Sequence, residues 1–256
     1  TSKTEPRLLC YDLGEGVTAF STTRHGGVSE ANYASFNINP YCGDSADHVA
    51  RNRQLLADRL GLPASHIVLP HQVHGIEHRA VAPELLDMSD AVRDKILDGV
   101  DMVTTSMTGV CIGVSTADCI PVLLYDPVAR ATAAIHAGWR GTLQRICQRA
   151  VMAMQLHYGT TPDRLRAVVG PGISLANFEV GQEVYDQFVQ AGFDLTETAE
   201  WHTKWHLDLP GINIRELIGC GVAPEHIHHA GICTFDHADD YFSARRLGID
   251  SGRIYT

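Results

Sequence analysis

The chain has 256 residues, of which 45% are hydrophobic and 20% charged, values typical of a globular protein with a sizeable core. Its formal net charge of −10 argues against nucleic acid as a general partner. No apolar run approaches the roughly 18 residues that a membrane helix needs, so no membrane is expected either. The seven cysteines are odd in number and follow no framework spacing, which predicts reduced thiols and a cytoplasmic location.

The predicted elements mix strands and helices without a strict alternation. Strands are expected where Val, Ile and Thr gather between Gly, Pro or Asp, and helices where apolar residues recur at helical spacing. In chain order we expect a strand at 17–22, a helix at 46–60, strands at 67–69, 102–105, 110–114, 120–125 and 132–136, a helix at 140–157, a strand at 165–169, helices at 179–191 and 212–219, and a strand at 227–233. The polar segment 82–99 is expected to be a surface excursion, for which a helix is one option.

The four strands expected between residues 102 and 136 indicate the fold class. They follow one another too closely for helical crossovers, so antiparallel pairing is expected. We therefore predict an α+β protein (mixed-sheet α/β), with largely antiparallel or mixed β-sheets flanked by helices. No linker or internal repeat divides the sequence, so residues 1–256 are expected to form a single domain.

The segment ADCIPVLLYDPVARATAAIHAGWRG (117–141) predicts a β-hairpin with reactive groups at its open end. With the turn at 126–129, the ladder places Cys119 opposite His136. Directly opposite residues point to the same face with Cβ atoms roughly 4.5–5.5 Å apart, so the thiol and the imidazole should meet. A slip of two residues would keep them on one face, whereas a slip of one residue would not.

A facing Cys and His supports two chemistries. One is a thiolate–imidazolium nucleophile of the kind that cysteine hydrolases use, and the other is a pair of ligands for a divalent metal such as zinc. A buried thiol beside a hydrogen-bonded core His is the ordinary alternative. The segment 69–78 offers His71, His74 and His78 as a third group, and His74, followed by Gly75, has room for close approach. Three protein ligands would leave one tetrahedral position for water or substrate, as in catalytic zinc sites.

Short motifs along nearly the whole chain match the motifs of one protein family. They include STTRHGGVS (21–29), SFNIN (35–39), HQVHG (71–75), DGVD (98–101), ADC (117–119), HAGWRGT (136–142) and FSARR (242–246). On these motifs the sequence resembles the laccase-domain proteins, also called polyphenol oxidases or peptidoglycan editing factors and now regarded as purine nucleoside phosphorylases with adenosine deaminase activity. HQVHG, ADC and HAGWRG in this order are a far more specific signal than any lone short motif.

The resemblance implies a metal site and two reactions. The metal ligands would be His74, Cys119 and His136, and the cofactor would be Zn²⁺, with copper as the alternative metal. The implied partners are purine nucleosides and phosphate. The first implied reaction is phosphorolysis of adenosine, inosine and methylthioadenosine to the free base and (methylthio)ribose 1-phosphate. The second is hydrolytic deamination of adenosine.

Other residues in the matching motifs are candidates for catalysis and substrate binding. Asp118 could orient a metal ligand, shuttle a proton or hydrogen-bond local backbone, and the sequence leaves these alternatives open. The planar fork of an arginine binds two phosphate oxygens at once, so arginines in the motifs are candidates for phosphate binding. The substrate-binding and phosphate-binding candidates are Arg24, Asn37, Arg140, Arg245 and Arg246.

Three other interpretations compete with this one. A cysteine hydrolase or amidase acting on peptidoglycan precursors would use Cys119 as nucleophile and His136 as base. A copper polyphenol oxidase would need several His-x-His pairs, and the chain has one, at residues 226–228. The H-x-E and P-C-x-x-C signature of the familiar zinc deaminases is absent, so deamination would rest on an unrelated site. A binding module without activity would not need converging ligands. The sequence does not indicate an oligomeric state.

Overall fold

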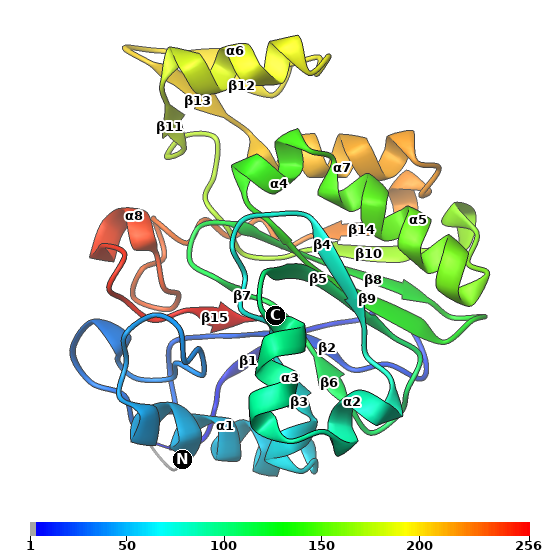
Figure 1. Cartoon of the computed structure of the whole chain (residues 1–256). Coiled ribbons are helices and arrows are strands. Elements are labelled where there is room, and N and C mark those ends of the chain that lie inside the picture. The colour runs from blue at the N-terminus through cyan, green and yellow to red at the C-terminus, as the bar shows by residue number, and fades with distance from the viewer. Residues whose placement is uncertain (1–3) are drawn as a thin grey trace.

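A six-stranded mixed sheet forms the centre of the computed structural model, which describes residues 4–256 (Figure 1). Across the sheet the strands are β14 (Ile227–His229), β10 (Arg166–Val169), β8 (Ile120–Asp126), β9 (Ala131–Ala137), β5 (Val100–Thr105) and β4 (Glu77–Ala80). The three inner pairs are antiparallel, whereas both edge strands, β14 and β4, run parallel to their neighbours. This arrangement confirms the predicted mixed α/β fold.

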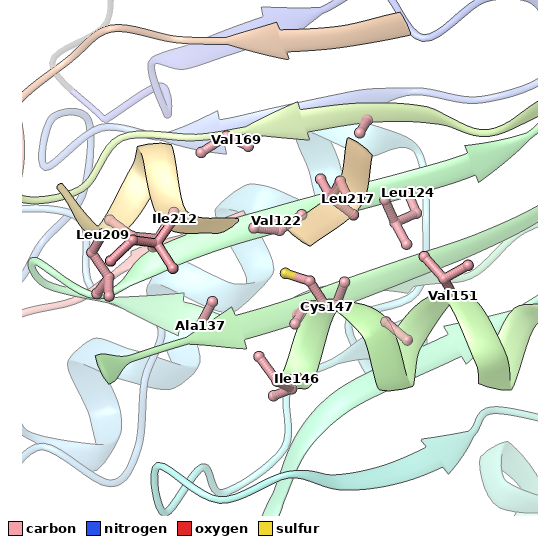
Figure 2. Close-up of a cluster of buried hydrophobic side chains, with 14 of the residues drawn as sticks. Val122, Leu124, Ala137, Ile146, Cys147, Val151, Val169, Leu209, Ile212 and Leu217 are labelled. Atoms are coloured by element: carbon pink, nitrogen blue, oxygen red, sulfur yellow. The ribbon is translucent and has the colours of Figure 1, made fainter. Parts of the chain in front are cut away.

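One face of the sheet is covered by helices α4 (Trp139–Leu143), α5 (Ile146–Tyr158) and α7 (Leu209–Gly219). Figure 2 shows how side chains of α5 and α7 pack onto the strands there. Val122 and Leu124 of β8 belong to this layer, together with Cys147 and Val151 of α5 and Leu217 of α7. Because side chains alternate along a strand, Leu123 and Tyr125 point to the other face. All seven residues of β8 are therefore buried.

The opposite face is covered by small sheets and helices from the N-terminal half. These are β1 (Leu8–Tyr11) with β2 (Ala19–Thr22), β3 (Ile67–Val68) with β6 (Cys111–Ile112), α2 (Pro83–Asp87) and α3 (Asp90–Leu97). Helix α1 (Ala46–Leu60) packs on a neighbouring cluster that includes Phe20, Phe36 and Tyr255. Strand β15 (Ile254–Tyr255) pairs with β7 (Ser115–Thr116), so the C-terminus of the chain lies inside the fold, close to the segment that precedes β8.

A separate three-stranded sheet stands apart from the central sheet. It consists of β11 (Glu179–Val180), β13 (Trp205–Leu207) and β12 (Ala199–Trp201), and helix α6 (Gln182–Gln190) packs on it. Figure 1 shows this unit at the top of the molecule, above α4 and the short helix α8 (Ala244–Leu247). Within residues 4–256, no helix is both long enough and apolar enough to span a bilayer.

Most predicted elements are present, and several differ in extent. The helix predicted at 46–60 is confirmed, and 82–99 contains the two short helices α2 and α3. The single helix predicted at 140–157 is wrong: it is interrupted at Arg145, which adopts a left-handed conformation with φ 60°. The Arg145 guanidinium donates to Glu216 Oε1 at 3.0 Å and to the Ala191 carbonyl at 3.2 Å, and these tertiary contacts hold the break. The strand predicted at 110–114 is reduced to β6, which pairs parallel with β3.

The hairpin of β8 and β9 forms as predicted, but its register is shifted by two residues. Pro121, and not Cys119, lies opposite His136. The turn begins one residue later than expected, because the Asp126 carboxylate accepts hydrogen bonds from the backbone N–H groups of Val128 and Ala129. A shift of two preserves the face on which each side chain points. Cys119 therefore remains on the His136 side of the sheet, one residue before β8 begins.

Candidate metal centre

His74, Cys119 and His136 converge at the open end of the β8–β9 hairpin. One ligand atom from each residue lies within 4.8 Å of the ligand atoms of the other two. The rings of His74 and His136 meet edge to face with their centroids 4.9 Å apart. Within residues 4–256 this is the one group of three or more His, Cys, Asp or Glu side chains with such spacing.

His136 is held in place from the neighbouring strand. It lies in β9 and is 3% exposed. Its Nδ1 donates to Asp101 Oδ1 at 2.7 Å. Asp101 lies in β5, and the register that pairs Met102 with Ile135 places Asp101 directly across from His136. Because Nδ1 is bound to the carboxylate, Nε2 is the nitrogen free to bind a metal.

His74 reaches the centre from the loop between β3 and β4. Both polar atoms of the Gln72 side chain bind the backbone of Ser115, donating to its carbonyl at 2.9 Å and accepting from its N–H at 2.8 Å. The Asp101 carboxylate accepts from the next three backbone N–H groups, those of Val73, His74 and Gly75, at 3.2, 3.0 and 2.8 Å. These bonds hold His74 in a left-handed conformation with φ 63°.

The other two His candidates of this segment have partners elsewhere. His71 Nδ1 donates to Asp98 Oδ1 at 2.7 Å, and its ring contacts the Tyr41 ring at a tilt of 31°. Nε2 of His78 pairs with the Thr104 hydroxyl at 2.8 Å. Of the three, His74 alone belongs to the cluster with Cys119 and His136.

Cys119 is positioned by the tight connection from β7 to β8, in which Asp118 has φ 85°. Burial by itself would raise the pKa of the Cys119 thiol, but the positive charge of His136 and hydrogen bonds from both imidazoles outweigh burial and lower the pKa to about 6. Burial likewise disfavours a charged His136, yet the Cys119 charge and the Asp101 hydrogen bond raise its pKa to about 9. The thiolate, which is the form that binds metals, is therefore favoured at neutral pH.

The three side chains fit a metal ion. Two imidazole nitrogens and one thiolate are ligands that both zinc and copper accept. Gly138 packs closely against two of these side chains. A Cβ atom added to it would lie 3.1 Å from Cys119 Sγ and 3.1 Å from His74 Cδ2. Three protein ligands leave at least one coordination position for water or substrate, which is the arrangement of a catalytic site.

Asp118 and Asn37 make internal hydrogen bonds. The Asp118 carboxylate accepts from the Thr234 hydroxyl at 2.7 Å and from the backbone N–H of Arg245 at 2.6 Å, tying two C-terminal segments to the residue before Cys119. Asn37 is fully buried, and its side-chain oxygen accepts from the backbone N–H of Arg253 at 3.1 Å.

The four arginine candidates differ in how their guanidinium groups are engaged. Arg24 donates to the carbonyls of Ala34 and Ala238 at 2.8 and 2.6 Å. Arg245 and Arg246 each donate to one carbonyl, those of Glu179 and Phe235. Arg140 is exposed, lies over the Trp139 ring at 4.4 Å from its centroid, and follows Gly138 by two residues. Of the four, Arg140 is thus the arginine nearest in sequence to the metal ligands.

Asp101 is the residue of this centre to which the sequence analysis assigned no role. A local signal was present, because Asp101 ends the motif DGVD directly before the strand predicted at 102–105. Its partner could not be assigned, because the pairing of this strand with the one at 132–136 is a long-range contact.

Known proteins resemble this chain over nearly its whole length. The sequence profile of the family described as "Multi-copper polyphenol oxidoreductase laccase" matches residues 18–256. A "Purine nucleoside phosphorylase" of Bacteroides thetaiotaomicron is 44% identical, over 98% of this chain and 95% of its own. "Adenosine deaminase RL5" of an unknown prokaryotic organism is 39% identical, over 94% of this chain and 93% of its own.

Solved structures show the same fold. The crystal structure of YlmD from Geobacillus stearothermophilus superposes with a TM-score of 0.86 at 30% identity, covering 96% of this chain and 92% of that one. The hypothetical protein YfiH of Bacillus licheniformis superposes with a TM-score of 0.90 at 29% identity, covering 98% and 95% of the two chains. The chain therefore belongs to the laccase-domain family, described as multi-copper polyphenol oxidoreductase laccase, whose relatives include proteins named purine nucleoside phosphorylase.

Proposed function

We propose that this protein is a zinc-dependent purine nucleoside phosphorylase. Its substrates would be adenosine, inosine and methylthioadenosine, which it cleaves with phosphate to the free base and (methylthio)ribose 1-phosphate. Hydrolytic deamination of adenosine would be a second activity of the same centre. The observation that carries the proposal is the convergence of His74, Cys119 and His136 in a chain whose relatives are named for these two activities.

Zinc is the metal that we propose for the centre. A structural zinc site would be closed by four protein ligands, whereas this cluster supplies three, as catalytic zinc sites do. Copper accepts the same donors, but a multi-copper oxidase needs several copper ions, and within residues 4–256 only this one cluster has three ligands. A zinc ion held by His74, Cys119 and His136 would supply Lewis-acid activation at its remaining coordination position.

The residues around the centre would bind and orient the reactants. We propose that Arg140 binds phosphate, because its guanidinium is exposed and lies close in sequence to Gly138, which packs against two of the metal ligands. Asp118 would orient the site through its neighbour Cys119, since its carboxylate accepts hydrogen bonds from the Thr234 hydroxyl and from the backbone N–H of Arg245 in α8. Arg24, Asn37, Arg245 and Arg246 would shape the substrate site through the segments that they hold.

Product analysis tests this function. Purified protein is incubated with inosine and with adenosine, each with and without phosphate, and the bases and sugar phosphates are separated and identified. We expect hypoxanthine and ribose 1-phosphate from inosine only when phosphate is present. Metal analysis of the same sample should show one zinc per chain, and Cys119→Ala should lose it. Base release that does not depend on phosphate, or no turnover of either nucleoside, would contradict the proposal.

A metal-free cysteine hydrolase is the second candidate function. The observation in its favour is the low pKa of Cys119 beside a His136 whose pKa is raised, because such a pair is an activated nucleophile. It predicts a metal-free protein whose activity towards peptidoglycan-type amides is lost on alkylation of Cys119. Stoichiometric zinc that protects Cys119 from alkylation would exclude it.

A further inference from the structure

We propose that Asp101 is the positioning residue that assembles the metal centre, because its single carboxylate holds two of the three ligands. It fixes the ring of His136 and it folds the loop that carries His74. The inference rests on the proposed metal-dependent function, but it concerns metal binding and can be tested without turnover.

The first action of Asp101 is on the imidazole of His136. The Nδ1–H of His136 donates to Oδ1 at 2.7 Å, and both side chains are almost wholly buried, at 4% and 0% exposure. A carboxylate cannot donate, so this bond selects the tautomer that carries its proton on Nδ1. Nε2 lies on the side of the ring away from Asp101 and, once it has lost its proton, is the nitrogen that binds a metal.

The second action is on the backbone of the His74 loop. Oδ1 accepts from the His74 N–H, and Oδ2 accepts from the N–H groups of Val73 and Gly75. His74 is a non-glycine residue with φ 63°, a left-handed conformation that is unfavourable for a residue with a side chain. Three hydrogen bonds to one buried carboxylate offset this cost. Without them the loop should relax and carry the His74 ring out of the cluster.

An Asp101→Asn substitution would keep the size of the side chain but could no longer accept all four hydrogen bonds. Four N–H donors converge on the two oxygens of Asp101. An amide offers one oxygen and replaces the other with an NH₂ donor, which would face donors. Either the His136 ring or the loop must then lose its acceptor, so at least one metal ligand is released.

A second Asp–His pair in the same region provides a matched control. Asp98 accepts from Nδ1 of His71 at 2.7 Å, the same distance as in the Asp101–His136 pair. Asp98 is 65% exposed and His71 is 41% exposed, and His71 does not belong to the cluster of three ligands. The two pairs thus share their chemistry and differ in whether the histidine is a metal ligand.

Cobalt(II) is the probe for the test, because a thiolate-bound tetrahedral cobalt ion absorbs in the visible and near-ultraviolet and reports both affinity and geometry. Metal-free wild type, Asp101→Asn and Asp98→Asn are titrated with cobalt in competition with a chelator. We expect Asp101→Asn to bind cobalt about 10–100-fold more weakly and with altered visible bands. Asp98→Asn should match the wild type in affinity and spectrum.

A third variant separates positioning from general damage to the fold. Asp101→Glu keeps the charge and both oxygens on a longer side chain, so it should bind cobalt more tightly than Asp101→Asn. The inference is overturned if Asp101→Asn keeps the wild-type affinity and spectrum, or if Asp101→Glu binds no better than Asp101→Asn. Wild type that binds cobalt but releases no base would overturn the proposed function and leave this inference standing.

Discussion

Replacing Gly138 by alanine should loosen the metal centre without disturbing the backbone. Gly138 immediately precedes α4 and has φ −70° and ψ 166°, a conformation that any residue adopts. The added methyl group would therefore bring no backbone strain. It would lie 3.1 Å from Cys119 Sγ, 3.1 Å from His74 Cδ2 and 3.8 Å from His136 Cε1. The perturbation is thus confined to the space between the three ligands.

The size of the effect follows from these distances. Contacts of 3.1 Å are tighter than real Cβ contacts normally are, so Cys119 and His74 must each retreat by a few tenths of an ångström. Metal–ligand bonds tolerate deviations of only about 0.2 Å. Two of three ligands would be displaced beyond that range. We expect the affinity for zinc to fall at least about tenfold, which corresponds to about 1.4 kcal/mol.

Chelator competition followed by metal analysis measures this loss, and thermal unfolding of the metal-free protein shows whether the fold is intact. Gly219→Ala is the control, because it introduces the same methyl group near the end of α7, where no atom lies within 4 Å. That variant should keep the wild-type zinc affinity. If Gly138→Ala also binds zinc as tightly as the wild type, the three side chains do not grip one ion in the way proposed here.

Two further predictions concern phosphate and pH. Arg140→Ala should raise the KM for phosphate about tenfold or more and leave the KM for inosine within about twofold, because a lost bidentate contact affects only the anion. Steady-state kinetics with each substrate varied in turn would measure both KM values. An unchanged KM for phosphate would remove Arg140 from the phosphate site. Burial raises the pKa of Glu216 from 4.5 to about 7 against the opposing charge of Arg145. Between these two pH values the folded state therefore binds more protons than the unfolded state, and the free energy of unfolding falls as pH rises. Glu216→Gln lacks this proton uptake and should gain stability relative to the wild type from about pH 5 to about pH 8, as measured by urea unfolding. A free energy of unfolding, variant minus wild type, that stays constant or falls as pH rises would contradict this assignment.

The local sequence determined which side chains share a face of the sheet. The alternating direction of side chains along 120–125 and 132–136 places Cys119 and His136 on the same side, and this conclusion survived a register shift of two residues. The helix at 46–60 was predictable for a similar reason, since its apolar spacing and the glycine that ends it are both local signals. Motif resemblance also indicated His74 as the third ligand, although local patterns alone left His71 and His78 as further candidates.

Only the tertiary structure decided how the centre is held together. The choice of His74 depends on Gln72 binding Ser115 and on Asp101 binding three N–H groups of the loop, contacts between segments far apart in the chain. The break at Arg145, the buried setting of Asn37 and the carbonyl partners of Arg24 are of the same kind. Side-chain alternation and helical spacing are periodic and can be read within one segment. A hydrogen bond between segments exists only after both have been packed against the same core, so no local pattern specifies it.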